Sequence, residues 1–253
     1  MKKNIVLERL KSNQRVLGCI IQGNLPSLVE MAGLAGFHFV FIDVEHYSFS
    51  MQDCENLVRA AETKGICPFI RTPYKDPKSV LKLLDIGATG IIYPEINTKE
   101  EAEKVVKFTK YPPHGVRGLA STRSADYGFT PKKEYIKHAN KEIAVIVVLE
   151  SQTALNNLDE ILSVKGIDAF LIGTSDLSMS LSLNGDASHP KVLAAVDEIL
   201  QMGKKLGVSI GGYLRSGQSP DEYFASGASI VMTSINSLLR KSLVDFVKKC
   251  MND

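Results

Sequence analysis

Short apolar runs rich in β-branched residues alternate along the chain with longer segments of helical periodicity. Continuous apolarity without polar alternation is typical of strands that are buried on both faces. In the longer segments, apolar residues recur at spacings of three and four, which predicts amphipathic helices. The pattern predicts strands at Val16–Ile21, Phe37–Ile42, Ile66–Arg71, Gly90–Pro94, Ile143–Leu149, Ala169–Ile172, Val208–Gly211 and Ile230–Met232.

Glycine and proline positions agree with this division. A helix often ends at a glycine, because a left-handed residue is needed there, and proline is favoured in the first helical turn. Glycines fall where predicted helices end, at Gly36, Gly65, Gly87, Gly166, Gly207 and Gly227. Prolines fall where predicted helices begin, at Pro77, Pro190 and Pro220.

The alternation of strand and helix implies parallel strands joined by right-handed crossovers. Eight such units in 253 residues are the usual size of a closed (β/α)₈ TIM barrel. We therefore predict an α/β fold with a single domain over residues 1–253. An open doubly wound sheet is the alternative, but its nucleotide-binding motifs, GxGxxG and GxxxxGK followed by Ser or Thr, are both missing.

One segment departs from the regular alternation. Residues 111–142 form a long connection rich in turn residues, with a short helix expected near Lys132–Ala139. A long connection in a compact barrel is usually a lid or a subunit contact. Leu238–Met251 is a candidate amphipathic helix.

Composition narrows the function classes. Apolar residues make up 44% of the chain, enough to fill a core, so intrinsic disorder is excluded. A net charge of +2 gives no reason to expect a nucleic-acid partner. No apolar run approaches the ~18 residues of a membrane span, and the N-terminus lacks the apolar stretch of a signal peptide. The four cysteines show no CxxC spacing, so we interpret them as reduced core thiols of a cytoplasmic protein.

The carboxyl ends of the predicted strands collect ionisable residues. In a (β/α)₈ barrel, catalytic groups gather at this end of the strands. The residues at or just beyond the strand ends include Asp43, Glu45, His46, Arg71, Glu95, Glu150 and Asp176. The rim therefore combines carboxylates, an arginine and a histidine.

Glu150 and Asp176 follow neighbouring strands. Two converging carboxylates repel unless one is protonated or a cation lies between them. An all-oxygen site with vacant positions suits Mg²⁺ or Mn²⁺. The alternative is that each carboxylate caps the helix that follows it. Because both close adjacent strands, we favour the metal site.

Arg71 and His46 complete this candidate site. The guanidinium of Arg71 starts from a buried strand and suits a substrate carboxylate or an enolate oxygen, although pairing with a rim carboxylate is an equal alternative. His46 is a candidate general acid/base, with an ordinary loop histidine as the alternative. His38 lies inside a strand and is expected to be a core residue.

Four stretches of the chain resemble the HpcH/HpaI aldolase family, which comprises metal-dependent class II aldolases of 2-oxo acids. The resemblance runs from about residue 17 to about residue 196 and includes an Asp-x-Glu-His element and a Gly-x-x-Asp-Leu element in matching order. The stretches are GFHFVFIDVEH, IRTPYKDPKSVLKLLDIGATGIIYPEINTKEEAEKVV, YPPHGVRG and GIDAFLIGTSDLSMSL.

The resemblance implies roles for individual residues. The positions of Glu150 and Asp176 bind the divalent metal, with Mg²⁺ or Mn²⁺ expected first and Co²⁺ or Zn²⁺ as alternatives. The position of Arg71 contacts pyruvate or its enolate, and that of His46 is the catalytic acid or base. Asp85 would partner this histidine, with a neighbouring subunit as one source. Backbone amides near Gly173, Thr174 and Ser175 would hold the pyruvate carboxylate.

The family's members are typically hexamers with an exchanged C-terminal helix, so the resemblance also implies a homo-oligomer, either a hexamer or a trimer of dimers. The sequence departs from the family's usual residues at three points. Val148 stands where glutamine is usual, Tyr47-Ser48 where Gly-Pro is usual, and Thr174-Ser175 where Pro-Ala is commoner. We expect Tyr47 to narrow the aldehyde side of the site.

We therefore expect an aldehyde-lyase that reversibly cleaves a 4-hydroxy-2-oxo acid to pyruvate and an aldehyde. Its partners would be these small molecules, with neither nucleic acid nor membrane. No lysine is placed at a strand end for a Schiff base. Two alternatives are a citrate-lyase-β-like enzyme acting on a CoA thioester and a catalytically silent barrel that binds a 2-oxo acid.

Overall fold

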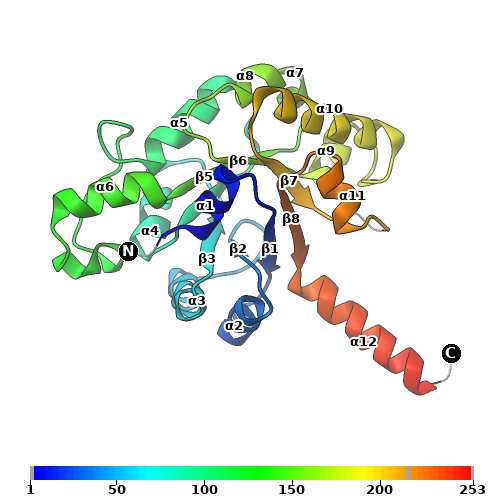
Figure 1. The fold of residues 1–253 in the computed structure, drawn as a ribbon, viewed down its shortest axis with the longest axis horizontal. Coiled ribbons are helices and arrows are strands. Elements are labelled where there is room, and N and C mark those ends of the chain that lie inside the picture. The colour runs from blue at the N-terminus through cyan, green and yellow to red at the C-terminus, as the bar shows by residue number, and fades with distance from the viewer. Residues whose placement is uncertain (1–2, 215–216, 252–253) are drawn as a thin grey trace.

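Parallel strands close on themselves in sequence order, and helices surround them (Figure 1). This computed structural model describes residues 3–214 and 217–251. The strands are β1 (Val16–Ile21), β2 (Phe39–Asp43), β3 (Cys67–Arg71), β4 (Gly90–Tyr93), β5 (Ala144–Leu149), β6 (Ala169–Ile172), β7 (Ile210–Tyr213) and β8 (Ile230–Ser234). The predicted (β/α)₈ barrel is confirmed.

Helices between successive strands cover the outside of the barrel, while α1 precedes the first strand and α12 follows the last one. They are α1 (Ile5–Lys11), α2 (Pro26–Leu34), α3 (Met51–Lys64), α4 (Pro77–Asp85), α5 (Lys99–Thr109), α6 (Lys132–Glu142), α7 (Gln152–Asn156), α8 (Leu158–Leu162), α9 (Thr174–Ser180), α10 (Pro190–Leu206), α11 (Pro220–Ala225) and α12 (Ile235–Met251), with a 3₁₀ segment η1 (Arg123–Gly128). The three prolines predicted at helix starts begin α4, α10 and α11, and the six predicted helix-end glycines all have positive φ.

Several strands begin one or two residues later than predicted, and the helix ends explain why. The residues concerned donate their N–H groups back to carbonyls in the last turns of α2, α3, α6 and α10; they are Phe37, Ile66, Ile143 and Val208. An apolar residue commonly follows a helix end and packs against the helix. These apolar residues therefore belong to helix ends, although the sequence pattern assigned them to strands.

Inside the barrel, alternate strand residues form one apolar cluster, while the other set packs against the surrounding helices. Phe39 and Phe41 of β2 point inward, as do Cys67 and Phe69 of β3. Because strand side chains alternate between faces, the next inward positions at the carboxyl ends of β2 and β3 are Asp43 and Arg71.

The same alternation operates on β5 and β6. Val148 and Leu171 belong to the inner cluster, so Glu150 and Gly173, two residues further on, continue the inward row. Strand register therefore places Glu150 and Gly173 at inward-facing positions above the inner cluster.

The amino-terminal end of the barrel is closed by α1. Its residues Val6, Leu7 and Leu10 are buried in the inner cluster. The side chain of Asn4 caps the helix by accepting from the amides of Val6 and Leu7. This end is therefore filled with apolar side chains.

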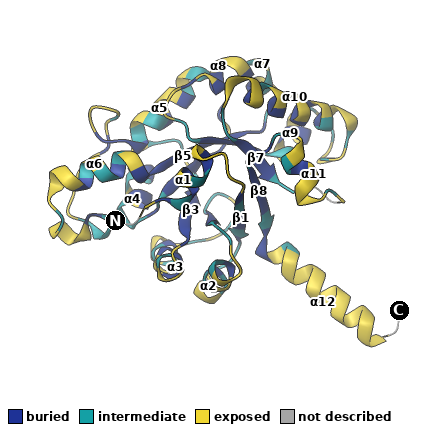
Figure 2. Cartoon of the chain, viewed as in Figure 1, coloured by how far each residue is buried: buried dark blue, intermediate teal, exposed yellow. Residues whose placement is uncertain are grey.

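Helix α12 leaves the barrel and extends away from it (Figures 1 and 2). Ile235, at its start, is buried, but the apolar side chains further along are exposed. They are Leu238, Leu239, Leu243, Val244, Phe246, Val247 and Met251. The expected amphipathic helix is present and begins three residues earlier than predicted.

The structure also bears on the predictions for the cysteines, for His38 and for membrane spans. Cys19, Cys54 and Cys67 are buried free thiols, as expected, but Cys250 is exposed on α12 and is not a core residue. His38 is partly buried and its Nδ1 accepts from the amide of Leu17 at 2.9 Å. In the described part of the chain, no helix is long and apolar enough to cross a membrane.

Candidate active site

A pocket of about 320 Å³ opens at the carboxyl ends of β2, β4, β5 and β6. The residues that line this carboxyl-end pocket are Glu45, His46, Glu95, Asn97, Glu150, Ser151, Asp176, Met179 and Ser180. The structure thus brings together three of the predicted site residues, His46, Glu150 and Asp176. They come from the segments that follow three different strands, β2, β5 and β6.

Glu150 is the most deeply buried carboxylate of this pocket, with 5% of its surface exposed. Burial and, to a smaller extent, the nearby Asp176 carboxylate raise its pKa to about 7, against the hydrogen bond from Glu95 and the charge of Arg71. A carboxyl group in this position favours either a proton or a cation. Asp176 is exposed on the first turn of α9 and faces the same pocket.

Gly173 allows the end of β6 to approach Glu150 closely. A Cβ atom on this residue would lie 2.6 Å from Glu150 Oε2, so a larger side chain would displace the carboxylate. The Gly173 amide donates to the carbonyl of Leu149 at 3.1 Å and is therefore already used. The amides of Thr174 and Ser175 lie in the first turn of α9, where helix amides lack a partner within the helix. In the segment predicted to bind the carboxylate, the amides of Thr174 and Ser175 therefore remain as donors, and that of Gly173 does not.

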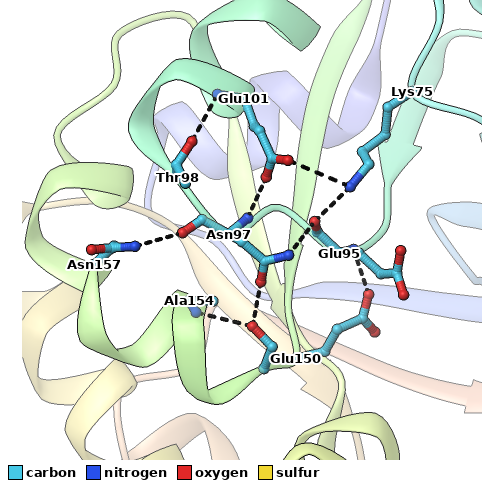
Figure 3. A network of polar contacts seen from close by, with 9 residues as sticks. Lys75, Glu95, Asn97, Thr98, Glu101, Glu150, Ala154 and Asn157 are labelled. Carbon is cyan, nitrogen blue, oxygen red and sulfur yellow. Dashed lines mark hydrogen bonds and ion pairs between the residues drawn. The ribbon is translucent and has the colours of Figure 1, made fainter.

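A left-handed turn after β4 holds Glu150 (Figure 3). Glu95 has φ of +52°, and its amide donates to Glu150 Oε1 at 2.6 Å. Its carbonyl accepts from Lys75 Nζ at 2.8 Å and from the side chain of Asn97 at 3.0 Å. Backbone strain of this kind persists only where surrounding contacts hold it.

Asn97 and Ser151 continue this network, and sequence analysis assigned neither of them a role. Ser151 donates to the side chain of Asn97 and accepts from the amide of Ala154 at 2.9 Å, where it caps α7. The backbone carbonyl of Asn97 accepts from Asn157 at 2.8 Å. The only signal in the sequence was their place just beyond strand ends, which they share with many loop residues.

Arg71 is fixed beside the pocket by two carboxylates. Its Nε and Nη2 donate to the two oxygens of Asp43 at 2.9 and 2.7 Å, and its Nη1 lies 3.1 Å from Glu45 Oε2. Burial lowers the pKa of Arg71, but the hydrogen bonds and charge of Asp43 and the charge of Glu45 outweigh this effect and raise it overall. A guanidinium has five N–H donors, so donors remain on Nη1 and Nη2. Both interpretations of Arg71 are thus compatible with the structure, since it pairs with rim carboxylates and keeps donors available.

Asp43 also shapes the loop that carries His46. Its Oδ1 accepts from the amides of Glu45 and His46 at 3.2 and 3.3 Å. The imidazole of His46 is more than half exposed, and its Nε2 lies 4.0 Å from Glu45 Oε2. Burial raises the pKa of Glu45, against the opposing charges of Arg71 and His46. An exposed imidazole at the pocket is accessible to a substrate hydroxyl.

Asp85 lies elsewhere in this chain, at the end of α4. Its carboxylate is 3.0 Å from Nη2 of Arg117, whose side chain is fully buried and also donates to the Tyr135 hydroxyl at 3.2 Å. Asp85 does not line the carboxyl-end pocket. Its pairing with His46 stays a prediction, and within one chain the structure does not bring the two together.

The long connection likewise lies away from this pocket. None of its described residues between 111 and 142 lines the carboxyl-end pocket. The helix expected within it is longer than predicted, covering Lys132–Glu142 as α6. The roles of lid and subunit contact remain predictions.

The donor set of the carboxyl-end pocket fits a hard divalent cation. Among the residues that the structure describes, no group of three or more His, Cys, Asp or Glu side chains is arranged to hold a metal ion. Glu150 and Asp176 both carry the oxygen atoms that Mg²⁺ and Mn²⁺ prefer, and their assignment as metal ligands stays a prediction. Burial and the neighbouring Asp176 raise the pKa of Glu150, and a cation beside its carboxylate would offset both effects.

The family description of HpcH/HpaI aldolase/citrate lyase matches residues 17–240. The chain belongs to this family. It is 32% identical over 241 residues to a 2-keto-3-deoxy-L-rhamnonate aldolase of Escherichia coli O17:K52:H18, covering 94% of this chain and 89% of that protein. It is 33% identical over 222 residues to a 5-keto-4-deoxy-D-glucarate aldolase of Shigella dysenteriae serotype 1, covering 88% and 86%.

A solved structure shares the whole fold. It is an HpcH/HpaI aldolase/citrate lyase family protein from Burkholderia cenocepacia J2315, with a TM-score of 0.92, 28% identity, and coverage of 98% of this chain and 100% of that chain. The predicted family and the predicted aldolase class of lyase are confirmed by these comparisons. The individual roles of the site residues stay predictions.

Proposed function

We propose that this member of the HpcH/HpaI family reversibly cleaves a 4-hydroxy-2-oxo acid to pyruvate and an aldehyde at the carboxyl-end pocket. The observation that carries this proposal is the convergence of Glu150 and Asp176 in one pocket with His46, beside the anchored Arg71. The names of the aldolase relatives support the same reaction class.

Glu150 and Asp176 would hold a divalent metal, Mg²⁺ or Mn²⁺, with Co²⁺ or Zn²⁺ as alternatives. When bound, such a cation supplies Lewis-acid stabilisation of enolate charge. The remaining donors of Arg71 would stabilise the developing oxyanion, because Asp43 and Glu45 already fix the direction of its guanidinium. The amides of Thr174 and Ser175 would bind the carboxylate of the 2-oxo acid.

His46 would move the proton of the 4-hydroxyl group. Its exposed imidazole at the pocket can reach a group on the substrate, and an imidazole exchanges protons near neutral pH. Asp85 of a neighbouring subunit would orient it, because Asp85 of the same chain does not line the carboxyl-end pocket.

We propose a homo-oligomer, a hexamer or a trimer of dimers, assembled through α12. The apolar side chains of α12 are exposed in the single chain, and a surface of this kind is typical of protein–protein contact. The buried free thiols of Cys19, Cys54 and Cys67 support a cytoplasmic location.

A metal-dependence assay tests the proposal. Purified protein treated with a chelator should not release pyruvate from 4-hydroxy-2-oxo acids, and Mg²⁺ or Mn²⁺ should restore release. Oxaloacetate decarboxylation, which needs the enolate but no 4-hydroxyl proton, should show the same dependence. Full activity in excess chelator would refute the metal-dependent mechanism, and binding of a 2-oxo acid without turnover would favour the silent barrel.

A further inference from the structure

The carboxyl end of β1 carries a polar residue that the proposed mechanism does not use. Ile20 of β1 packs against the inner cluster, so Gln22, two residues further on, continues the inward row. Strands β1 and β2 are paired in register, with Ile21 opposite Ile42. The residues that follow this pair, Gln22 and Asp43, are therefore neighbours at the rim of the barrel.

Gln22 is bonded to the loop that follows β2. Its Nε2 donates to the hydroxyl of Tyr47 at 2.6 Å, and both side chains are partly buried. The carbonyl of Tyr47 accepts from the amide of Phe49 at 3.0 Å. Glycine, the usual residue at position 47 in the family, has no side chain that could make the contact with Gln22. In this chain, Tyr47 thus ties the loop to the end of β1.

His46 lies between two anchors of this loop. On one side, Asp43 Oδ1 accepts from the amides of Glu45 and His46 at 3.2 and 3.3 Å. On the other side, Gln22 holds the hydroxyl of Tyr47. In the described part of the chain, the imidazole has only its approach to Glu45 Oε2, and 4.0 Å is too long for a hydrogen bond. The position of the imidazole therefore depends on the two anchors of its loop.

The carboxamide of Gln22 is not the side chain that stability alone would favour. Its Oε1 is buried and has no hydrogen-bond partner among the described residues. A buried acceptor without a partner destabilises the fold, because its contact with water is lost and not replaced. An apolar side chain of similar length would fill the same space without this effect. The presence of glutamine here therefore favours a role in activity.

We propose that Gln22 and Tyr47 are positioning residues for His46. Their hydrogen bond fixes the loop after β2, so that the imidazole stays at the carboxyl-end pocket and faces the 4-hydroxyl group of the substrate. This inference rests on the proposed function, in which His46 moves the proton of that group. The role differs from the one proposed for Asp85, which would contact the imidazole itself.

Two variants that remove the hydrogen bond test the proposal. Tyr47→Phe deletes the hydroxyl, and Gln22→Met replaces the carboxamide with an apolar chain of similar length. Each should lower the kcat for cleavage of 4-hydroxy-2-oxopentanoate, assayed with Mn²⁺, by ~10-fold, because a small displacement of an acid/base slows proton transfer. The KM should change by less than about 2-fold, and oxaloacetate decarboxylation should fall much less than cleavage, since it needs no proton from a 4-hydroxyl group.

The double variant and the melting temperatures separate positioning from a structural role. Tyr47→Phe combined with Gln22→Met should lose no more activity than either single variant, because both remove the same bond. Gln22→Met should melt at the temperature of the unaltered protein or above it, since it also removes the unpaired oxygen. A merely structural role would lower the melting temperature and leave the ratio of the two activities unchanged.

Tyr93→Phe is the matched control. The hydroxyl of Tyr93 also makes a bond of 2.6 Å, to the hydroxyl of Thr109, and the side chain is fully buried among the residues that pack against the surrounding helices. This variant should lower the melting temperature and leave the ratio of cleavage to decarboxylation unchanged. It therefore reports what the loss of a tyrosine hydroxyl does away from His46.

The outcomes separate this inference from the proposed function. Unchanged cleavage in both single variants overturns the inference, as do equal losses of cleavage and decarboxylation or losses that multiply in the double variant. In each of these cases the unaltered protein still cleaves the 4-hydroxy-2-oxo acid, so the proposed function stands. An unaltered protein that decarboxylates oxaloacetate but cleaves no 4-hydroxy-2-oxo acid refutes the proposed function and this inference together.

Discussion

The two ends of the barrel use the same strands for opposite purposes. At the amino-terminal end, α1 inserts Val6, Leu7 and Leu10 into the inner apolar cluster. At the carboxyl end, the inward positions that continue the same rows are occupied by polar residues such as Arg71 and Glu150, with exposed loops instead of a plug. The inward-facing positions of one strand thus lie in the apolar core at the amino-terminal end and in the candidate site at the carboxyl end.

The difference lies in what holds each end together. At the plugged end, stability comes from apolar burial, which is non-directional and tolerates changes of shape. At the open end, Arg71 is fixed by Asp43, and Glu150 by the amide of Glu95, through directional contacts at 2.6–2.9 Å. The comparison implies that substitutions at the open end should affect activity and that those at the plugged end should affect stability.

The largest effect is expected for the metal ligands. Glu150→Ala or Asp176→Ala should lower kcat/KM by ~10³-fold or more, since the loss of either carboxylate leaves one protein ligand. Divalent-metal binding by calorimetry should be lost in the double variant, while the melting temperature changes little. Tight metal binding by the double variant would place the metal elsewhere.

The plugged end should show the reverse behaviour. Leu7→Ala opens a cavity beneath the barrel and should lower the free energy of unfolding by about 2–4 kcal/mol. The kcat/KM of the folded variant should match the unaltered protein, measured well below its melting temperature. A selective loss of kcat without loss of stability would contradict the division between the two ends.

His46→Ala should separate two reactions at the open end. Retro-aldol cleavage should fall by ~10²-fold, the usual contribution of a positioned acid/base. Oxaloacetate decarboxylation, which needs no proton from a 4-hydroxyl group, should fall much less. Equal losses in both assays would mean that His46 positions the site and does not transfer the proton.

Arg71→Lys tests the role of the guanidinium at the open end. Lysine keeps the charge but loses the planar fork that binds both oxygens of Asp43, so turnover should fall by ~10-fold. Steady-state kinetics with saturating substrate measures the change. If kcat and KM are both unchanged, Arg71 serves only the ion pairs with Asp43 and Glu45.

The smallest effect concerns pH. The pKa of Glu150 is about 7 in the folded chain against an ordinary value of 4.5, so the folded, metal-free protein binds more protons than the unfolded chain. Its stability should therefore decrease as pH rises through this interval, and less so in Glu150→Gln. Melting temperatures in chelator at about pH 5 and about pH 8 measure this slope. Because a metal competes with this proton, metal affinity should weaken below about pH 7.

Much of the site was accessible from strand ends and family motifs. His46, Glu150 and Asp176 were each placed at the rim by the sequence, and they do line one pocket. The hydrogen bond from the Glu95 amide to Glu150 was not predictable from the sequence. It depends on a left-handed backbone conformation at Glu95, which local propensity disfavours for a residue other than glycine. Asp85 shows a further limit, since its neighbour in the fold, Arg117, is 32 residues away in sequence.

The chain's own periodicity determined the order of strands and helices, because apolar spacing and helix-end glycines depend on residues a few positions apart. The same periodicity determined which residues of each strand share a face, since side chains alternate along a strand whatever its partner strand is. Barrel closure decided which rim residues meet. It brings residues 46, 95, 150 and 176 from the segments after four separate strands into one pocket and leaves residue 85 outside it. Closure also buries Glu150 beside Asp176 and so raises its pKa, a property that no short stretch of sequence carries.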